Sequence, residues 1–334
     1  MPETKSGAKY GLITIGNALV DVLTHKEDDY LTAQNMDKGA MALIDAERAL
    51  ALYNDMDDKT EMSGGSAGNT MACFASFGGK GGYIGKVGDD VLGKKFASSL
   101  QDMSVDFQTT PLPKGSTGRC MILVTPDGER TMNTYLGAAV ELTPADIDPD
   151  FIAQAKVTYL EGYLFDPPQA KEAFVKSARE AHNAGRRVAL TLSDSFCVDR
   201  HREAFKDLVS YHVDILFANE DEIKSLYETD ALEDAIKQAT SKCAIVAITR
   251  GAQGSVIINS GIRTNVTAEE NVTVLDTTGA GDAYAAGFLY GFTEDMDMAQ
   301  CGRLGSIAAA EVISQIGPRP SVSLAALMQE KKVA

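Results

Sequence analysis

The segment Asp276–Asp282, with the sequence Asp-Thr-Thr-Gly-Ala-Gly-Asp, combines small residues with a carboxylate in a spacing that suits anion chemistry. It follows a β-like run at 272–275 and leads into the apolar stretch Ala283–Leu289, which predicts a helix. A strand that feeds a glycine-rich turn at a helix N-terminus directs free backbone N–H groups, and the positive end of the helix dipole, at one point. We therefore expect an anion site at residues 279–281, of the kind that stabilises a phosphoryl group during transfer.

Asp282 stands in the first turn of that expected helix, where its carboxylate can take the proton from an attacking hydroxyl. The alternative is a plain turn with an aspartate that caps the helix, and a lone Gly-x-Gly-Asp favours this alternative. The segment is not a Walker A loop, because no Gly-Lys-Ser/Thr follows, and it is not a dinucleotide-binding fingerprint, which belongs at the start of a βαβ unit. Other motifs must therefore decide between a catalytic and a capping aspartate.

Three further positions have residue types that suit ligand binding. Asp21 follows the first expected strand, where an α/β sheet places side chains that contact ligand hydroxyls, and a turn cap is the alternative. Asn219–Glu222 begins a helix, where it would serve equally well as an acidic N-cap or as an oxygen-rich metal site. Arg130 ends a predicted turn, and on its own it is equally a solvated surface arginine.

Short apolar runs between polar helical segments indicate the elements that position these residues. Alternating strands and helices predict an α/β fold with a mostly parallel central sheet and helices on both faces. From residue 283 to the end the chain is expected to be helical, with a break at 317–320. The strands are expected at 10–15, 158–160, 188–192, 215–218 and 245–249, and the helices between them at 168–184, 199–210 and 220–240, the last one split near residue 229.

Two stretches break this alternation, from about residue 22 to 62 and from about residue 106 to 136. They contain short β-like pieces, such as Gly39–Ile44 and Cys120–Val124, joined by polar turns. We expect these strands to leave the main sheet and to form a small β lid over the site. Because the sequence has no linker-like stretch and no internal repeat, residues 1–334 are expected to form a single domain with this lid inserted in it.

Composition limits the classes of function. The chain has 334 residues, 44% of them apolar, which is enough to bury a large core. Its 31 basic and 47 acidic residues give a net charge of −16, which disfavours nucleic acid and an anionic membrane surface as partners. Five scattered cysteines without a C-x-x-C spacing indicate free thiols in a reducing compartment, and the apolar run at 12–15 is too short for a signal peptide, so we expect a cytoplasmic protein.

The order of several motifs resembles the ribokinase-like (PfkB) family of carbohydrate and nucleoside kinases. Asp276–Asp282 with the following Ala-x-x-Ala-Gly-Phe resembles the C-terminal signature of that family, and Ser63–Asn69 with Gly85–Gly93 resembles its N-terminal pattern. The resemblance extends from Gly16 to Pro320, nearly the whole chain. It implies a ribokinase-like three-layer sandwich and a kinase that uses ATP and Mg²⁺ to phosphorylate a hydroxyl group.

The resemblance also implies roles for individual residues. Asp282 becomes the general base, Arg130 a lid arginine at the transferring phosphate, and Glu222 with Asn219 the residues that hold Mg²⁺ through water. The backbone amides implied for the anion hole are those of Gly279, Ala280 and Gly281. The residues implied to line the nucleotide are Asn219, Thr249, Arg250, Gly251, Gly254 and, beside the adenine, Ala309. A monovalent cation, K⁺, is implied near Asp276, Thr278, Gly317 and Ser321.

On the acceptor side the sequence looks most like the adenosine kinases of this family, because Gly-Asn-x-x-x-Asp at 16–21 and Gly-Gly-Ser-x-x-Asn at 64–69 match their pattern. Phe196 resembles an aromatic residue that stacks on the purine, although core packing is the alternative for a single phenylalanine. The implied reaction is the ATP-dependent phosphorylation of the 5′-hydroxyl of adenosine to AMP, a step of purine salvage. The implied hydroxyl contacts are Asn17, Asp21, Gly64, Gly65 and Asn69, and the implied apolar walls are Leu19, Met132, Phe165 and Phe196.

Other functions stay open at this point. A sugar kinase for ribose or fructose, or a kinase for inosine or guanosine, would share the same frame. Outside the enzymes, the alternative is a ligand sensor without catalysis, against which the intact Asp282 and the pair Asn219 and Glu222 argue. The sequence does not distinguish a monomer from a homodimer.

Overall fold

The chain folds around a main sheet with the strand order β14-β13-β12-β11-β10-β9-β1-β5-β6. The structure is a computed structural model, which describes residues 7–333. From β12 to β6 neighbouring strands pair in parallel, whereas β12, β13 and β14 pair antiparallel at one edge. The strands are β1 (Tyr10–Ile15), β5 (Gly81–Ile84), β6 (Asp106–Phe107), β9 (Ala155–Glu161), β10 (Arg187–Thr191), β11 (Ile215–Asn219), β12 (Ile245–Thr249), β13 (Ser255–Asn259) and β14 (Ile262–Val266).

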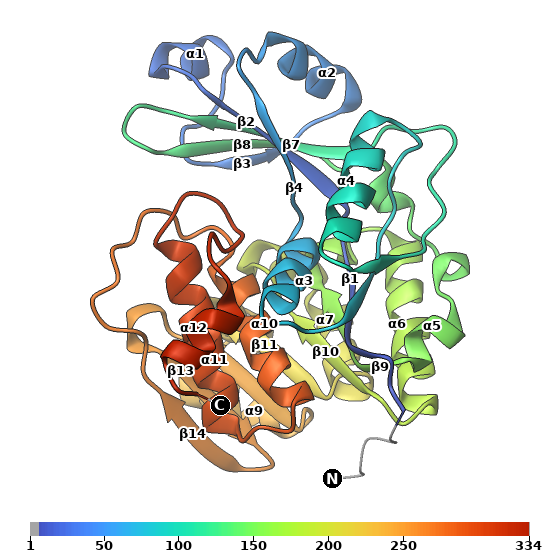
Figure 1. The fold of residues 1–334 in the computed structure, drawn as a ribbon, viewed down its shortest axis with the longest axis vertical. Helices are drawn as coiled ribbons and strands as arrows, with labels where there is room; N and C mark the ends of the chain where they lie inside the picture. Colours follow the sequence, from blue (N-terminus) through green and yellow to red (C-terminus); the bar gives the residue numbers. More distant parts are fainter. Residues whose placement is uncertain (1–6, 334) are drawn as a thin grey trace.

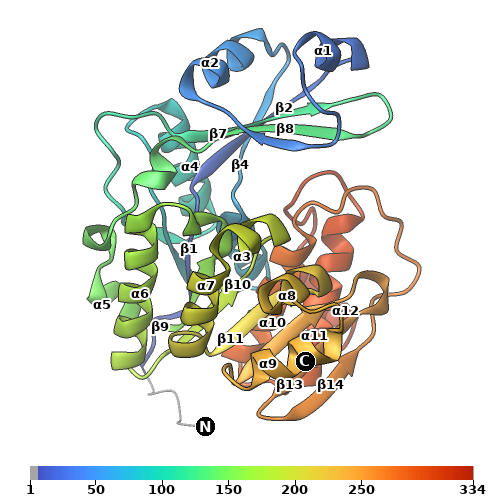
Figure 2. The same ribbon diagram turned by 180° about the vertical axis from the view of Figure 1, so that it is seen from behind.

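Helices cover both faces of this sheet, which is why its central strands are almost entirely apolar. Side chains alternate between the two faces: Leu12 and Tyr159 pack with one helical layer, and Ile13 and Leu160 pack with the other. Figures 1 and 2 show the two layers from opposite sides. The first layer contains α3 (Ser66–Ser76), α4 (Val91–Asp102), α10 (Ala280–Thr293), α11 (Met298–Ile313) and α12 (Leu324–Glu330), and the second contains α5 (Pro149–Ala153), α6 (Pro168–Asn183), α7 (Ser195–Tyr211), α8 (Glu220–Tyr227) and α9 (Leu232–Thr240).

Local signals in the sequence explain most helix boundaries. Gly185 follows the end of α6 with φ +72°, in the left-handed region that favours glycine. The expected break near residue 229 separates α8 from α9, and α7 begins earlier than predicted because Asp194 accepts a hydrogen bond from Cys197 N and caps it. The prediction of a strand at 272–275 is wrong, because this segment is irregular and Leu275 N donates to Ile313 O on α11.

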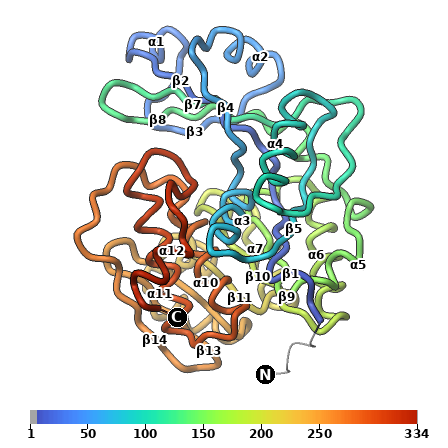
Figure 3. Tube along the Cα trace, viewed as in Figure 1, coloured from blue at the N-terminus to red at the C-terminus, as the bar shows by residue number. Residues whose placement is uncertain are grey.

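A second, five-stranded sheet lies above the carboxyl ends of the main-sheet strands (Figure 1). Its order is β3-β8-β7-β2-β4, and two segments distant in sequence, coloured blue and green in Figure 3, combine in it. It begins at Leu19, before the expected boundary at residue 22, whereas β6 of the expected second segment belongs to the main sheet. The strands are β2 (Leu19–His25), β3 (Met41–Leu43), β4 (Thr60–Ser63), β7 (Gly118–Val124) and β8 (Arg130–Tyr135).

The two faces of the second sheet have different partners. Val20, Val22 and Leu123 pack against α1 (Asp28–Ala33) and α2 (Ala46–Asp55) on the outer face. The opposite face presents a smaller apolar cluster of Cys120, Ile122 and Val124, with Leu23 and Met132 packed against it. This apolar face is directed at the main sheet, so a cavity with one apolar wall lies between the two sheets. Within residues 7–333, the helices are too short or too polar to cross a membrane.

Candidate active site

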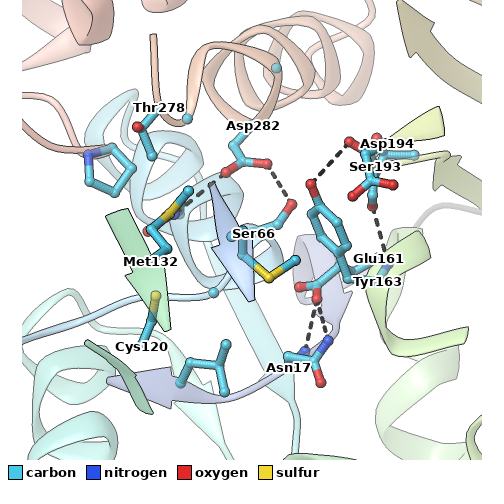
Figure 4. A pocket seen from close by; sticks show the side chains of 18 of the residues that line it. Asn17, Ser66, Cys120, Met132, Glu161, Tyr163, Ser193, Asp194, Thr278 and Asp282 are labelled. Carbon is cyan, nitrogen blue, oxygen red and sulfur yellow. Dashed lines mark hydrogen bonds between the residues drawn. The ribbon is translucent and has the colours of Figure 1, made fainter. Parts of the chain in front are cut away.

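A cavity of about 910 Å³ lies between the carboxyl ends of the central strands and the second sheet, within the usual size range of small-molecule sites. Parallel strands carry their ligand-binding residues at this edge, because the loops that follow each strand converge there. The predicted site residues that line this cavity are Asn17, Leu19, Asp21, Gly65, Asn69, Met132, Phe196, Asn219, Glu222, Thr249, Thr278, Gly279, Ala280, Gly281 and Asp282. Figure 4 shows how some of their side chains face one another.

Asp282 lies in the first turn of α10, opposite the N-terminus of α3. Ser66 Oγ donates to Asp282 Oδ1 at 2.5 Å, and Asn69 Nδ2 lies 3.5 Å from Oδ2. Burial raises the pKa of Asp282 to about 6, and these two donors oppose the rise. The carboxyl group is therefore mainly ionised at neutral pH but remains basic enough to accept a proton. Ser66 is a site residue that the sequence analysis missed.

The loop before α10 has the conformation expected of an anion site. Gly279 has φ +79°, and an added Cβ would lie 2.6 Å from Pro318 Cβ, so both backbone conformation and space require glycine there. Ala280 N donates to Thr277 O at 3.2 Å, so this amide already has a partner inside the turn. An added Cβ at Gly281 would meet nothing within 4 Å, which leaves its backbone open to a ligand.

A second cavity, of about 580 Å³, adjoins the first one. It contains the predicted nucleotide residues Gly251, Gly254 and Ala309, but Arg250 does not line it and instead pairs with Glu220, with Nε 2.5 Å from Oε1. Both cavities reach the loop before α10 and the first turns of that helix. The residues that line both of them are Thr249, Thr277, Ala280, Gly281 and Tyr284. The predicted anion site at residues 279–281 therefore lies where the two cavities meet.

Asp21, on β2 of the second sheet, and Gly65 line the first cavity, and Gly64 lies directly beside the Asp21 carboxyl group. An added Cβ at Gly64 would lie 2.4 Å from the Asp21 carboxyl group, and at Gly65, which has φ +80°, it would lie 2.1 Å from Asn17 O. Burial raises the pKa of Asp21 to about 6, while the positive charges of Arg319 and then Arg130 lower it. The two glycines are thus required for the close approach of backbone and carboxylate.

Glu161, at the end of β9, is a second residue that the sequence analysis missed. It is 1% exposed, and it accepts hydrogen bonds from Asn17 N, from Asn17 Nδ2 at 2.8 Å and from Ala67 N at 2.7 Å (Figure 4). Burial raises its pKa to about 7. Because Ala67 lies in the first turn of α3, Glu161 connects the loop after β1 to the helix that carries Ser66.

The aromatic residues do not all lie where the sequence predicts them. Phe165 is a wrong prediction, because it is 3% exposed and its ring stacks on Phe205 inside the core. Tyr163, two residues earlier, lines the cavity instead, and it packs against Ser193, to whose carbonyl oxygen its hydroxyl donates at 3.3 Å. Phe196 is 74% exposed and lines the same cavity, so it is not a core residue.

Asn219 and Glu222 form a capping box at the start of α8. Asn219 Nδ2 donates to Glu222 Oε1 at 2.7 Å, and Glu222 N donates to Asn219 Oδ1 at 2.8 Å. Glu222 nevertheless lines the first cavity, and burial raises its pKa to about 7. No group of three potential metal-binding side chains occurs within residues 7–333. A single carboxylate still fits Mg²⁺, which is held mainly by water and substrate phosphates in such sites.

The side chains beside the loop implied to hold K⁺ have other partners. The Asp276 carboxylate accepts from Thr278 N at 3.0 Å and from Gly317 N at 2.8 Å, and Arg130 Nη1 lies 3.0 Å from its Oδ2. Ser321 donates to Glu311 Oε1 through both its backbone N and its Oγ. The backbone carbonyls near Asp276 and Thr278, which the resemblance implies for K⁺, stay a prediction. Arg130 thus joins the second sheet to the loop before α10.

Comparisons with known proteins agree with this arrangement. Residues 46–324 match the model of the pfkB family of carbohydrate kinases. The adenosine kinase of Saccharomyces cerevisiae is 27% identical, covering 92% of this chain and 96% of that protein. The solved structure of adenosine kinase from Sinorhizobium meliloti is 51% identical and has a TM-score of 0.90, with 97% of this chain and 100% of that chain covered. The solved structure of a probable sugar kinase protein from Rhizobium etli is 49% identical and has a TM-score of 0.91, with 98% of this chain and 100% of that chain covered.

The predicted fold class is therefore confirmed, with its mostly parallel sheet between two helical layers. The chain belongs to the pfkB family of carbohydrate and nucleoside kinases, and it is a phosphotransferase that acts on a hydroxyl group.

Proposed function

We propose that this kinase transfers the γ-phosphate of ATP to the 5′-hydroxyl of adenosine and releases AMP and ADP. The observation that carries the choice of acceptor is the character of the first cavity: it has carboxylates at one end and an apolar wall over it. The wall residues are Leu19, Met41, Leu43, Cys120, Ile122 and Met132 from the second sheet, with Tyr163 and Phe196 from the main domain.

A purine nucleoside matches both parts of such a cavity. Its ribose hydroxyls can donate to Asp21, while its flat base can lie against aromatic and aliphatic side chains such as Phe196. A free sugar has hydroxyl groups all around its ring, and several of them would lose their hydrogen bonds to water against an apolar wall. The name of the Sinorhizobium meliloti relative, an adenosine kinase at 51% identity, supports the same choice.

In the proposed reaction the acceptor hydroxyl lies beside Asp282 and takes over the contact that Ser66 makes in its absence. Asp282 takes the hydroxyl proton as the new oxygen–phosphorus bond forms and the bond to the leaving ADP breaks. The nucleotide lies in the second cavity, so its γ-phosphate reaches the junction at Ala280 and Gly281. The backbone amide of Gly281, together with the N-terminal end of α10, stabilises the charge on the transferring group.

Three other features support phosphoryl transfer. Glu222, which lines the first cavity, would hold Mg²⁺ through water, and the ion would neutralise charge on the phosphates. Arg130 is placed at the edge of the second sheet, beside the loop that carries the anion site. We infer that this sheet acts as a lid, which excludes water and holds the acceptor in line with the phosphate.

The test is an ADP-release assay with adenosine, inosine, guanosine, ribose and fructose as acceptors. Adenosine is expected to give the highest kcat/KM. In the Phe196→Ala variant the KM for adenosine should rise about 10-fold or more, because stacking of a base on an aromatic ring contributes on the order of 1–3 kcal/mol. Tyr211→Ala is the matched control, since Tyr211 is an exposed aromatic residue at the other end of α7. Turnover of ribose or fructose without turnover of adenosine would refute the proposal in favour of a sugar kinase.

A further inference from the structure

Arg319 is a partly buried cation that the proposed reaction does not use. It belongs to the irregular segment between α11 and α12, and it enters the space between α3 and α4. Its Nε lies 3.3 Å from Asn69 Oδ1 on α3, and its Nη1 lies 3.2 Å from Ser99 Oγ on α4. Among the residues that the structure describes, its buried Nη2 has no hydrogen-bond partner.

The contact with Asn69 determines the orientation of that amide. A guanidinium has donors and no acceptor, so it can face only the oxygen of an amide group. With Oδ1 directed at Arg319, the Asn69 NH₂ group must point to the other side, where it lies 3.5 Å from Asp282 Oδ2. Asn69 is 5% exposed, so water has little access to either end of its amide group. Arg319 on one side and Asp282 on the other therefore orient Asn69 with its NH₂ group towards the acceptor.

Of the positive charges around Asp21, that of Arg319 lowers the pKa of the carboxyl group most. The charged groups that face Asp21 are Arg319, Arg130 and the negative Asp282, and Arg319 opposes the burial of the carboxylate most strongly. The titratable groups around Arg319 are Asp21, Cys73 on α3 and Tyr83 on β5. Burial raises the pKa of both Cys73 and Tyr83, so they are neutral at neutral pH. Asp21 is thus the carboxylate whose charge acts on Arg319.

We propose that Arg319 is a positioning residue of the acceptor site: it fixes the Asn69 amide and keeps Asp21 in the ionised form that accepts hydrogen bonds from acceptor hydroxyls. The inference rests on the proposed function for the location of the acceptor, but it does not depend on the base that the acceptor carries. It predicts that Arg319 affects acceptor binding and its pH dependence, and that it does not affect nucleotide binding, because the second cavity does not contain it.

The experiment compares Arg319→Met, Arg319→Lys and the parent protein over pH 5 to 8.5, with adenosine as the acceptor. In the methionine variant we expect the KM for adenosine to rise about 10-fold or more, and the KM for ATP to stay within about 2-fold. The acidic limb of kcat/KM should move to higher pH, because Asp21 loses the charge that favours its ionised form. In the lysine variant the limb should stay in place while the KM for adenosine still rises, because an ammonium keeps the charge but lacks the planar fork.

Arg187→Met is the matched control. Arg187 is a partly buried arginine that pairs with Asp214, and it lies at the amino-terminal end of β10, whereas the cavity lies at the carboxyl ends of the strands. A merely structural role would lower the thermal midpoint of Arg319→Met as in the control but leave its acidic limb in place, and this result would overturn the proposal. If the methionine variant does not fold, an unchanged KM for adenosine in Arg319→Lys overturns it. If adenosine is not turned over but ribose is, the proposed function fails, and the same comparison with ribose still tests Arg319.

Discussion

Replacement of Asp282 by asparagine tests the catalytic base and its electrostatic environment together. The pKa of Asp282 rises from an ordinary value of 3.8 to about 6 because the carboxyl group is buried. Since the folded-state pKa is the higher one, the folded protein binds this proton more tightly than the unfolded chain does. Ionisation of Asp282 therefore destabilises the fold as the pH rises from about 4 to above 6, by up to roughly 3 kcal/mol for a two-unit shift.

Asp282→Asn removes this ionisation and retains the shape of the side chain. Its amide oxygen can still accept from Ser66, while its NH₂ group loses the contact with Asn69, so we expect a net gain in unfolding free energy of about 1–2 kcal/mol at pH 8. At pH 4 the gain should disappear, because the parent carboxyl group is then largely protonated. In the same variant kcat should fall about 100-fold or more, since an amide cannot accept the hydroxyl proton.

Two measurements check this prediction: urea unfolding at pH 4, 6 and 8, and steady-state ADP release at pH 7.5. Asp234→Asn is the matched control, because Asp234 is an exposed aspartate in the first turn of another helix, α9. The control should change neither kcat nor the pH dependence of stability. A variant of Asp282 that kept the parent kcat would refute its role as the base. A stability difference that was the same at pH 4 and pH 8 would refute the account of its buried charge.

Two other substitutions test the groups around this carboxylate. Ser66→Ala removes the 2.5 Å hydrogen bond to Asp282 in the free enzyme, which should raise the pKa of Asp282 by about one unit and move the acidic limb of kcat/KM to higher pH, whereas Ser177→Ala, at a buried serine of α6, should not; an unmoved limb would show that Ser66 does not stabilise the ionised base. Gly64→Ala places a Cβ 2.4 Å from the Asp21 carboxyl group, so the KM for the acceptor should rise about 100-fold with an unchanged KM for ATP, and an equal rise in both constants would contradict the placement of Asp21 in the acceptor site.

Local sequence patterns predicted much of the frame and those parts of the site whose residues are consecutive. The glycines at 279 and 281 and Asp282 act within one turn, so their conformation is determined by their own segment. The parallel strands were also predictable, because burial on both faces requires continuous apolar runs. The run at 272–275 has the same composition, yet Val274 and Leu275 are exposed and form no strand. A run of this kind becomes a strand only where a neighbouring strand pairs with it, and local composition does not reveal that partner.

The missed residues depend on contacts between distant segments. Glu161, Ser66 and Arg319 are ordinary polar residues in sequence, and each gains its role only where the fold brings another segment to it. Phe165 and Tyr163 show the same limit at shorter range. Both lie in the turn after β9, and the direction of that turn places Phe165 in the core and Tyr163 in the cavity. Aromatic character alone could not distinguish them.

The position of Asp282 explains how one carboxylate can be both buried and useful at neutral pH. It lies where the N-termini of α3 and α10 face each other, so two helix dipoles and the donors Ser66 and Asn69 favour its ionised form. Burial alone would raise its pKa further and leave it protonated, whereas full exposure would leave it a weak base. The pKa of about 6 results from the opposition of these effects. A change to either helix N-terminus should therefore alter the pH dependence of the reaction before it alters the fold.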